Sequence, residues 1–398
     1  MTKILILADD LTGALDSGVQ LARKGAYVKV ITNYTYKIEL PVKDIDVVVI
    51  NTETRHLSKE EAYSNTFRVL KDLNLEGIDM IYKKTDSVLR GNIGAELEAV
   101  MKATGKNHIQ FIPAYPKLGR TTKNGIHYIY GTPISDSIFS KDLRNPITES
   151  NVTSIIHQQS DVPVILSDEE NRKEGIILHD CCTNQQLEEI YKKLEKQNDL
   201  SLLAGCAGFM EMVMLNTKKY KDHLCEIKVD GIKEIIVLCG TTNPVSLKQL
   251  EYAEIAGANY IRVSMFDIVQ ENNWREKFDI ELKNFLIKKS RIGLKIIGTT
   301  ADVIHFEKAS QQIADGFGYI AKRVLKNSAN TVLMVIGGDT LLSVMKELNV
   351  ECISPKCELF PGVVLSEFCY ENKNRYLISK SGGFGSPQLL IDIFKKLT

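Results

Sequence analysis

The first ten residues constrain the fold more than any other stretch of this chain. Four consecutive apolar residues, Ile4 to Leu7, predict a short strand buried on both faces, as central strands of parallel sheets are. Asp9 and Asp10 stand where that strand ends, and Gly13 permits a tight turn before a helical pattern begins. Because ligands of open α/β sheets bind outside the carboxyl ends of strands, we expect this edge to carry function.

The adjacent carboxylates Asp9 and Asp10 allow two interpretations. Two acids at one sheet edge repel each other unless a cation, a hydroxyl donor or a basic side chain shares them, which favours a working site. In the alternative, Asp10 or Thr12 caps the helix and Asp9 is a solvated loop acid. We favour the functional interpretation, because a cap needs only one of the two acids.

Short apolar runs alternate with helical segments along the first half of the chain, a pattern typical of a wound, mostly parallel sheet. The predicted strands are 4–7, 28–32, 47–51, 80–84, 109–113, 175–179 and 201–205, and the predicted helices include 59–73, 92–104 and 184–196. Residues 113–147 lack periodicity and predict a long irregular loop.

A second wound segment follows the charged stretch 218–230, which predicts a linker. Its predicted strands are 235–239, 260–263, 294–299 and 331–336, with helices from 245, over 309–324 and over 341–348. A chain of 398 residues is too long for one core. We therefore predict an α/β fold of two domains, 1–228 and 229–398. Each is expected to be a wound, mostly parallel sheet flanked by helices, with the active site in the cleft between them.

Composition excludes several classes of function. Lys plus Arg and Asp plus Glu each number 50, so no excess charge points to nucleic acid or to an anionic membrane. We expect neither a secretory leader nor a membrane-spanning segment, and therefore a soluble cytoplasmic protein. The eight cysteines lack a Cys-x-x-Cys spacing and the histidines lack metal-ligand spacing, which argues against a disulfide framework and structural zinc. The composition is compatible with a monomer or a homodimer.

Three glycine-bearing loops follow predicted strands in the second half: Gly240-Thr-Thr-Asn243, Gly337-Gly-Asp-Thr340 and Lys380-Ser-Gly-Gly-Phe-Gly385. Glycine lets backbone N–H groups approach a phosphate, and the N-terminus of a following helix favours an anion. Asp339 is a candidate ligand for Mg²⁺ or its water shell, and Thr340 for a phosphate oxygen. Neither the Gly-x4-Gly-Lys-Ser/Thr motif nor Gly-x-Gly-x-x-Gly occurs, so a nucleotide site here has another design.

Cationic loops follow predicted strands in the first half. The run Lys83 to Gly91 carries three cations and one acid, and Arg90 has the planar fork that grips a carboxylate with two parallel bonds. A later loop adds Arg120 beside threonines and glycines. A solvated charge cluster is the alternative for the first run. Together these loops favour a small, anionic, hydroxylated ligand.

These motifs resemble the four-carbon acid sugar kinase family over nearly the whole chain. The matching segments are Ala8–Asp16, Lys84–Gly91, the loop with Gly119–Thr121, Gly125 and Gly131–Pro133, then Gly337–Thr340 and Lys380–Gly385. The resemblance implies a sugar-acid-binding N-terminal domain and a nucleotide-binding C-terminal domain. It also implies a role in carbohydrate metabolism: transfer of phosphate from ATP to the terminal hydroxyl of an acid such as D-threonate, D-erythronate or an oxo-tetronate.

Carried over position by position, the resemblance implies the following site. The ATP contacts are Thr241, Gly337, Gly338, Asp339, Thr340, Gly382 and Gly383. As a hypothesis from the residues themselves, we add Mg²⁺ near Asp339 and sugar-acid contacts at Asp9, Asp10, Lys84, Arg90, Gly91 and Arg120. The catalytic candidates in this hypothesis are Asp10 by preference, then Asp9 and Asp86. Two positions depart from the family pattern: Thr241 and Cys206 stand where serine is usual.

Other interpretations fit less well. A haloacid-type phosphatase would need a nucleophilic carboxylate where this chain has Ala8. A dehydrogenase would need the missing glycine fingerprint. A non-catalytic sensor that binds a sugar acid and a nucleotide stays open as the alternative, and consumption of ATP that depends on a four-carbon acid would distinguish the two.

Overall fold

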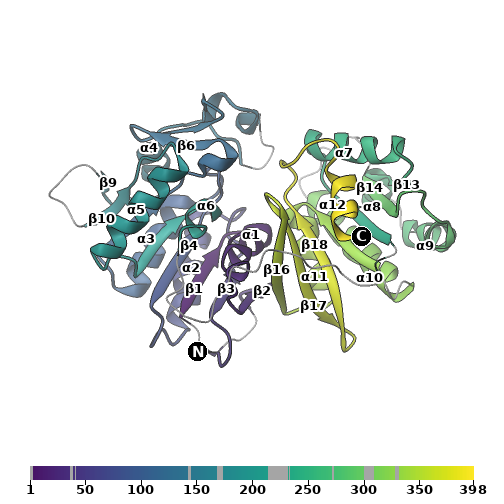
Figure 1. Cartoon of the computed structure of the whole chain (residues 1–398), viewed down its shortest axis with the longest axis horizontal. Coiled ribbons are helices and arrows are strands. Elements are labelled where there is room, and N and C mark those ends of the chain that lie inside the picture. The colour runs from purple at the N-terminus through teal and green to yellow at the C-terminus, as the bar shows by residue number, and fades with distance from the viewer. Residues whose placement is uncertain are drawn as a thin grey trace. The chain divides into compact units, whose positions relative to one another are not determined.

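The structure of the chain is a computed structural model that describes residues 3–35, 39–40, 42–141, 145–167, 174–213, 232, 234–270, 273–299, 309–327 and 331–398. These residues fall into two compact units, one within Met1–Asp222 and one within His223–Thr398 (Figure 1). The predicted linker 218–230 and the predicted boundary between 228 and 229 lie outside the described residues.

The first unit is built on one sheet of parallel strands in the order β2-β3-β1-β4-β11-β5-β10-β9. These strands are β1 (Ile4–Ala8), β2 (Val28–Ile31), β3 (Val47–Asn51), β4 (Met80–Lys84), β5 (His108–Ile112), β9 (Val164–Leu166), β10 (Gly175–Leu178) and β11 (Leu202–Gly205). Every residue of β1 is buried, as its unbroken apolar run predicts. From β1 the chain winds out to β2 and β3 and then crosses to β4, so the strand order reverses at β1.

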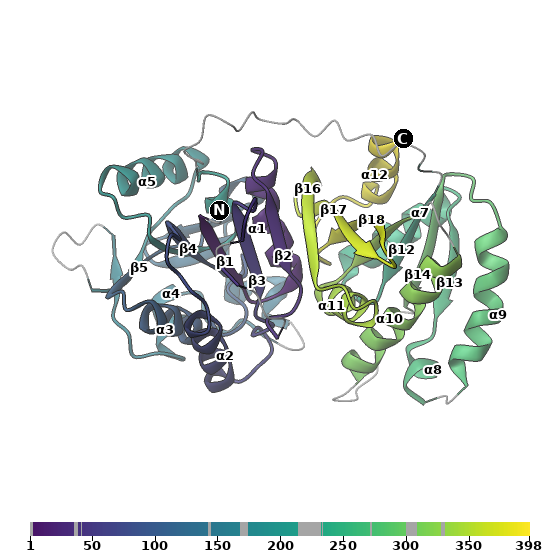
Figure 2. The ribbon, with the colours of Figure 1, turned by 90° about the horizontal axis from the view of Figure 1, so that it is seen from below.

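Helices cover both faces of this sheet. They are α1 (Leu11–Ala22), α2 (Lys59–Lys71), α3 (Ile93–Thr104), α4 (Val152–His157), α5 (Asn184–Lys196) and α6 (Ala207–Met210). Helices α2, α3 and α4 lie on one face and α1, α5 and α6 on the other (Figure 2). Capping boxes at Ser58 with Glu61 and at Thr183 with Gln186 start α2 and α5, so local sequence sets both helix starts.

The prediction of an irregular loop over 113–147 is wrong in its middle. A small antiparallel sheet forms there from β6 (Arg120–Lys123), β7 (Ile126–Ile129) and β8 (Thr132–Pro133), with 3₁₀ turns at Pro116–Leu118, Ile134–Asp136 and Ile138–Lys141. Two-residue turns at Asn124-Gly125 and Tyr130-Gly131 join the strands, and all four residues have positive φ, as such hairpins require. Strands of two to four residues hold too few alternations to give a periodic signal.

The second unit is a mixed sheet in the order β13-β14-β12-β15-β18-β17-β16. Its strands are β12 (Glu234–Cys239), β13 (Asn259–Val263), β14 (Leu294–Thr299), β15 (Thr331–Ile336), β16 (Cys352–Phe360), β17 (Val363–Tyr370) and β18 (Lys373–Lys380). Strands β13 to β15 and β18 run parallel to β12, whereas β17 pairs antiparallel with both of its neighbours, β18 and β16. The prediction of an α/β fold with two wound, mostly parallel sheets is confirmed.

The helices of the second unit are α7 (Pro244–Ile255), α8 (Met265–Gln270), α9 (Trp274–Ile287), α10 (Ala309–Asn327), α11 (Gly338–Glu347) and α12 (Leu389–Leu397). Helix α7 contacts α12, and α10 contacts α8, α9 and α11 (Figure 2). Helix α11 begins at Gly338 rather than at the predicted Leu341. As a result, its first turn contains the loop that the sequence marked as phosphate-binding.

Two further expectations concern the whole chain. Among the described residues, no helix is both long enough and apolar enough to cross a membrane. The described cysteines 181, 182, 206, 239, 352 and 369 are free thiols, whereas Cys357 is disulfide-bonded.

Candidate functional site

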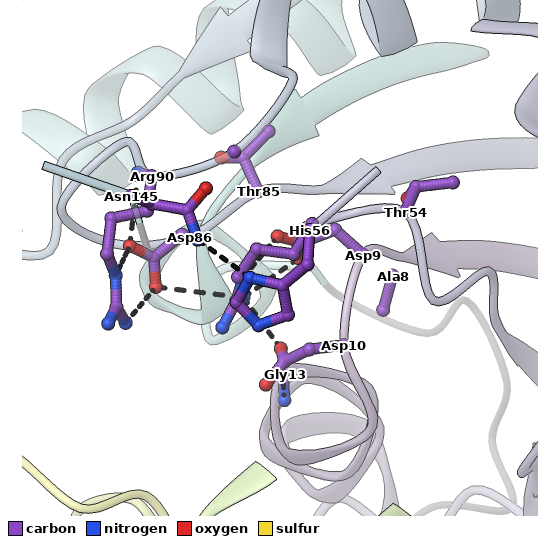
Figure 3. Close-up of polar contacts among 12 residues, drawn as sticks. Ala8, Asp9, Asp10, Gly13, Thr54, His56, Thr85, Asp86, Arg90 and Asn145 are labelled. Atoms are coloured by element: carbon purple, nitrogen blue, oxygen red, sulfur yellow. Dashed lines mark hydrogen bonds and ion pairs between the residues drawn. The ribbon is translucent and has the colours of Figure 1, made fainter. Parts of the chain in front are cut away.

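The carboxyl ends of β3, β1 and β4 bring a cluster of charged side chains together (Figure 3). Ala8, the last residue of β1, pairs with Asn51 of β3 on one side and with Lys84 of β4 on the other. The residues that follow these strands therefore meet at one edge, beside the point where the strand order reverses. Open α/β sheets bind ligands at such points.

Arg55 is the centre of this cluster. Its Nε donates to Asp9 Oδ2 at 2.7 Å, and its Nη2 donates to Asp9 Oδ1 at 3.0 Å and to Asp10 Oδ1 at 2.7 Å. The same Nη2 lies 3.7 Å from Asp86 Oδ1. One guanidinium thus compensates three carboxylates, which explains how two adjacent acids are held at a mostly buried edge.

The acidic and basic groups of this cluster keep one another ionised. Burial acts to raise the pKa of Asp9, but Arg55, Lys83 and Lys84 outweigh it and hold the pKa below its usual range. The same balance holds for Asp86, where Arg90 and then Arg55 overcome burial and hold the pKa far below normal. Burial acts to lower the pKa of Arg55, and the three acids raise it instead. Asp9 and Asp86 are therefore ionised at any pH near neutrality.

Asp10 caps α1, as the alternative interpretation expected, but Asp9 is buried and is not the solvated loop acid of that interpretation. As the N-cap of α1, Asp10 accepts a hydrogen bond from Gly13 N at 3.0 Å and another from the Thr12 hydroxyl. It also accepts from Arg55. Its side chain is 16% exposed against 1% for Asp9, so Asp10 is the acid of the pair that a ligand can reach.

Arg90 is held by Asp86 through two parallel bonds, Nε to Oδ2 at 2.9 Å and Nη2 to Oδ1 at 3.0 Å. Its guanidinium carbon also lies 5.5 Å from the centre of the Phe139 ring, a cation–π contact. Gly91 follows with a φ of +89°, and a Cβ there would lie 3.2 Å from Arg55 Cγ and 3.3 Å from Arg55 O. The glycine is required because Arg55 packs against its backbone.

Lys84 and Arg120, the other predicted cations, have different surroundings. Lys84 Nζ donates to Thr85 O at 2.8 Å, and a Cβ on Gly13 would meet both Asp10 Oδ1 and Lys84 Nζ within 3 Å. Lys84 thus converges on Asp10. Arg120 lies on β6, where it donates to Leu118 O and stacks 5.3 Å from the centre of the Tyr130 ring. These contacts hold Arg120 to its own hairpin.

The three glycine loops of the second unit lie side by side, because β12, β15 and β18 are neighbouring parallel strands. Gly337 N donates to Lys380 O at 3.0 Å, which joins the second loop to the third. A Cβ on Gly382 would lie 3.5 Å from Thr241 Oγ1, and one on Gly240 would collide with Thr340 Oγ1. The structure therefore brings the predicted nucleotide residues to one edge.

Lys380 is buried beneath these loops at the end of β18. Its Nζ donates to the carbonyl oxygens of Ser381 at 2.9 Å and Gly382 at 3.3 Å, and lies 3.4 Å from Ser246 Oγ. These three hydrogen-bond partners of the ammonium are uncharged. Burial lowers the pKa of Lys380 to about 8. A buried ammonium of this kind suits an anion placed on the loops.

The residues present fit a polyphosphate. Gly337 is the N-cap of α11 and offers no side-chain hydrogen bond to the first turn, and the N-terminus of a helix favours an anion. Asp339 is exposed in the first turn of the helix. The described residues contain no group of three acids, histidines or cysteines that could hold a metal alone. Mg²⁺ usually takes one or two carboxylates together with substrate phosphates, so one exposed acid fits that mode.

The fold and the site define a two-domain α/β protein. One domain carries a polar site of paired acidic and basic side chains, and the other carries a sheet edge whose groups suit a phosphate. The chain belongs to the family whose model is described as "Sugar-binding N-terminal domain", which matches residues 4–213. A second model, "Nucleotide-binding C-terminal domain", matches residues 236–390.

Curated relatives cover nearly the whole chain. D-threonate kinase of Salmonella typhimurium is 26% identical and covers 98% of this chain and 97% of its own. D-erythronate kinase of Heliobacterium modesticaldum is 25% identical, with 91% and 89% covered. 3-oxo-tetronate kinase of Brucella melitensis is 24% identical, with 98% and 94% covered. These relatives confirm the resemblance that the motifs indicated.

Solved structures share the fold. A protein of Salmonella typhimurium LT2 matches with a TM-score of 0.78 and 22% identity, covering all of this chain and 98% of its own. A Haemophilus influenzae protein matches with a TM-score of 0.68 and 19% identity, covering 99% and 100%.

Sequence reasoning missed Arg55 and passed over Lys380. Arg55 lies four residues beyond the end of β3, the strand next to β1. Its position after a predicted strand could therefore have identified it as a residue of this sheet edge. Lys380 ends β18, and neither this strand nor its antiparallel neighbour β17 was predicted, so the burial of the ammonium could not be foreseen.

Proposed function

We propose that this protein is an ATP-dependent kinase that phosphorylates the terminal C4 hydroxyl of a four-carbon sugar acid such as D-threonate, D-erythronate or an oxo-tetronate. The observation that carries the proposal is the pairing, in one chain, of the Arg55-centred acid cluster with the three-loop glycine edge. Relatives of nearly full length that are named as four-carbon acid kinases support kinase chemistry.

The first unit would bind the acid. Lys84 and Arg90 would face its carboxylate, with Arg120 as a further candidate, and Gly91 keeps the room that Arg55 needs. Asp9 would serve to orient Arg55, because Arg55 engages both of its oxygens. Asp10 would accept hydrogen bonds from the substrate hydroxyls, since it is the more exposed acid of the pair.

Asp10 is also the preferred acceptor of the proton that leaves the C4 hydroxyl during transfer. Asp9 and Asp86 are weaker candidates, because arginine forks occupy them and hold the pKa of each carboxyl below its usual range. Phosphoryl transfer depends mainly on positioning and on neutralising charge, so a well-placed weak base is sufficient.

The second unit would bind ATP. Its phosphates would lie against Thr241, the α11 N-terminus from Gly337 to Thr340, and the loop with Gly382 and Gly383, with Lys380 beneath. Asp339 would hold Mg²⁺ or its water shell, and the ion when bound neutralises phosphate charge. Transfer requires the C4 hydroxyl and the last phosphate of ATP to meet in line.

The first experiment is a coupled ADP-release assay with Mg²⁺-ATP against D-threonate, D-erythronate, L-threonate and 3-oxo-tetronate. Turnover of one acid well above the rate with ATP alone is the expected result, and it would name the substrate. Binding of ATP and of an acid with no turnover of any acid would contradict the kinase proposal and favour the non-catalytic sensor.

A further inference from the structure

A fully buried ion pair lies directly behind the acid site. Lys83 Nζ and Glu96 Oε1 are 3.0 Å apart, and neither side chain has any exposed surface. Lys83 is in β4 immediately before Lys84, and Glu96 is in the first turn of α3. Removing two charges from water costs several kcal/mol per ion, and an apolar pair of similar size often gives equal or better stability. Stability alone therefore does not explain this pair.

The other bonds of the pair lead to the strand ends that carry the site. Lys83 Nζ also donates to Lys84 O at 2.9 Å, and Glu96 accepts from the Thr54 hydroxyl. The Thr54 and Thr52 hydroxyls lie 2.8 Å apart, and Thr52 donates to Ala8 O at 2.9 Å. The network thus connects the ends of β1, β3 and β4 to the start of α3.

Each end of the network lies within two residues of a charged group of the acid site. Asp9 follows Ala8, Arg55 follows Thr54, and Asp86 is two residues beyond Lys84. The backbone amide of Arg55 also donates to Asp9 O at 3.3 Å. A shift of Thr54 would therefore move the Cα atom of Arg55. The guanidinium of Arg55 must bond to two acids at once, so its position would change with it.

We propose that Lys83 and Glu96 are positioning residues for the acid site: their ion pair holds Thr54, and through it Arg55, in register with Asp9 and Asp10. The consequence for turnover rests on the proposed kinase function, whereas the consequence for the loop 52–57 does not. Asn92 Nδ2 donates to Thr54 O and Leu57 O, both at 2.9 Å, so a second brace from the start of α3 holds the same loop.

The charge of Asp9 links the pair to the acid site. Asp9 acts electrostatically on both Lys83 and Glu96, and Arg55 bonds to Asp9 through two nitrogens. Lys83 helps to hold the pKa of Asp9 below its usual range. Burial first, and then the charge of Asp9, raises the pKa of Glu96, although Lys83 opposes this.

The test compares two site variants with a matched control in the full-length chain. Glu96→Gln keeps the size of the side chain and one acceptor oxygen but removes the charge, and Lys83→Met removes the ammonium. The control is Lys295→Met: Lys295 is 2% exposed, its Nζ lies 2.7 Å from Glu234 Oε2, and it is near the amino end of β14, in the other unit. The readouts are hydrogen exchange of 52–57, melting temperature, and kinetics with the acid and with ATP.

We expect both site variants to speed exchange of 52–57 and to lower kcat/KM for the acid by about 10–100-fold, because small misplacements cost that much. The KM for ATP should stay within about twofold. Lys295→Met should lower the melting temperature and leave exchange of 52–57 and both KM values unchanged. If Lys83→Met does not fold, Glu96→Gln still decides the question.

Two outcomes would overturn the proposal. One is a fall in melting temperature like that of Lys295→Met with wild-type exchange of 52–57 and wild-type kcat/KM, which would make the pair merely structural. The other is a Glu96→Gln effect that is undiminished in an Arg55→Ala background, because an effect routed through Arg55 must vanish there. If the wild type turns over no acid, the kinase proposal fails, and exchange of 52–57 alone then decides the positioning role.

Discussion

The two sheet edges differ in the chemical groups that they present to a charged ligand. The first edge is made of side chains of both signs that already hold one another, with Arg55 bonded to Asp9 and Asp10 and Arg90 bonded to Asp86. The second edge is made of backbone, glycine and hydroxyl groups above one buried ammonium, Lys380. The first edge is therefore organised by ion pairs among its own side chains, whereas the second presents backbone N–H groups and one ammonium.

This difference matches the ligands proposed for each edge. An acid with several hydroxyls needs both donors and acceptors at fixed places, which paired carboxylates and guanidiniums supply. A polyphosphate needs N–H groups and positive charge from several directions, which a helix N-terminus and glycine loops supply. Changes at one edge should consequently leave binding at the other intact, and the predictions below test that separation.

The largest effect is expected from Asp10→Asn. Asparagine still caps α1, so the helix should keep its start, while the proposed proton acceptor is lost. We expect kcat to fall about 10²–10⁴-fold, as for the loss of other general bases. The measurement is ADP release at saturating acid, with ATP binding by calorimetry as the control. A variant that keeps more than about a tenth of the wild-type kcat would exclude Asp10 as the base.

A smaller effect is expected from Gly337→Ala at the second edge. Gly337 has a φ of +106°, and a Cβ there would lie 3.4 Å from Thr340 Oγ1 and 3.5 Å from Thr241 Cβ. Such strain costs about 1–3 kcal/mol, and we expect a comparable loss of ATP affinity without a change in acid binding.

The control for Gly337→Ala is Gly77→Ala. Gly77 has a similar positive φ of +79°, but a Cβ there would meet nothing within 4 Å. It should lower stability and leave ATP affinity unchanged. Equal ATP affinity in both variants would show that the loop at Gly337 is not part of the nucleotide site.

The smallest effect is a pH dependence confined to the second edge. Because burial lowers the pKa of Lys380 to about 8, its ammonium loses its proton above that pH, and a bound phosphate should raise the pKa again. ATP binding should therefore take up a proton just above pH 8 and weaken by up to about tenfold per pH unit there. Lys380→Met should bind ATP more weakly at pH 7 and lose this dependence.

Calorimetry in buffers of different ionisation enthalpy, at about pH 8.5, measures that proton uptake. Binding of the acid to the first edge serves as the control, since Asp9 and Asp86 stay ionised in this range. The same uptake in Lys380→Met as in the wild type would contradict the assignment.

Much of the fold followed from strands buried on both faces. Strands 47–51, 80–84, 294–299 and 331–336 were predicted residue for residue, because short, mainly apolar runs between polar loops are typical of central strands in parallel sheets. The antiparallel strands β16 to β18 were missed. In β16, buried and half-exposed positions alternate, but Pro355 and Cys357 take buried positions and Phe360 a half-exposed one, so the alternation of apolar and polar residues is weak.

The site was predictable where residues are close in sequence and not where folding brings them together. Asp9, Asp10, Asp86 and the glycine loops are local motifs. Their partner Arg55 is 46 residues from Asp9 in sequence, and only the pairing of β1 with β3 places it there. Glu96 is equally remote, because its relation to Thr54 depends on how α3 packs.

Asp10 caps α1 and, under the proposed function, also accepts the proton of the substrate hydroxyl, so the start of a helix and a step of the proposed reaction would depend on one carboxylate. Fraying of the first turn of α1 would then switch off turnover before the rest of the domain melts. Evolution also has little freedom at this residue: replacements that spare the helix lose the acid, and glutamate, which keeps the acid, is too long for the cap. A faster descendant of this protein would have to improve the groups around Asp10 instead of Asp10 itself.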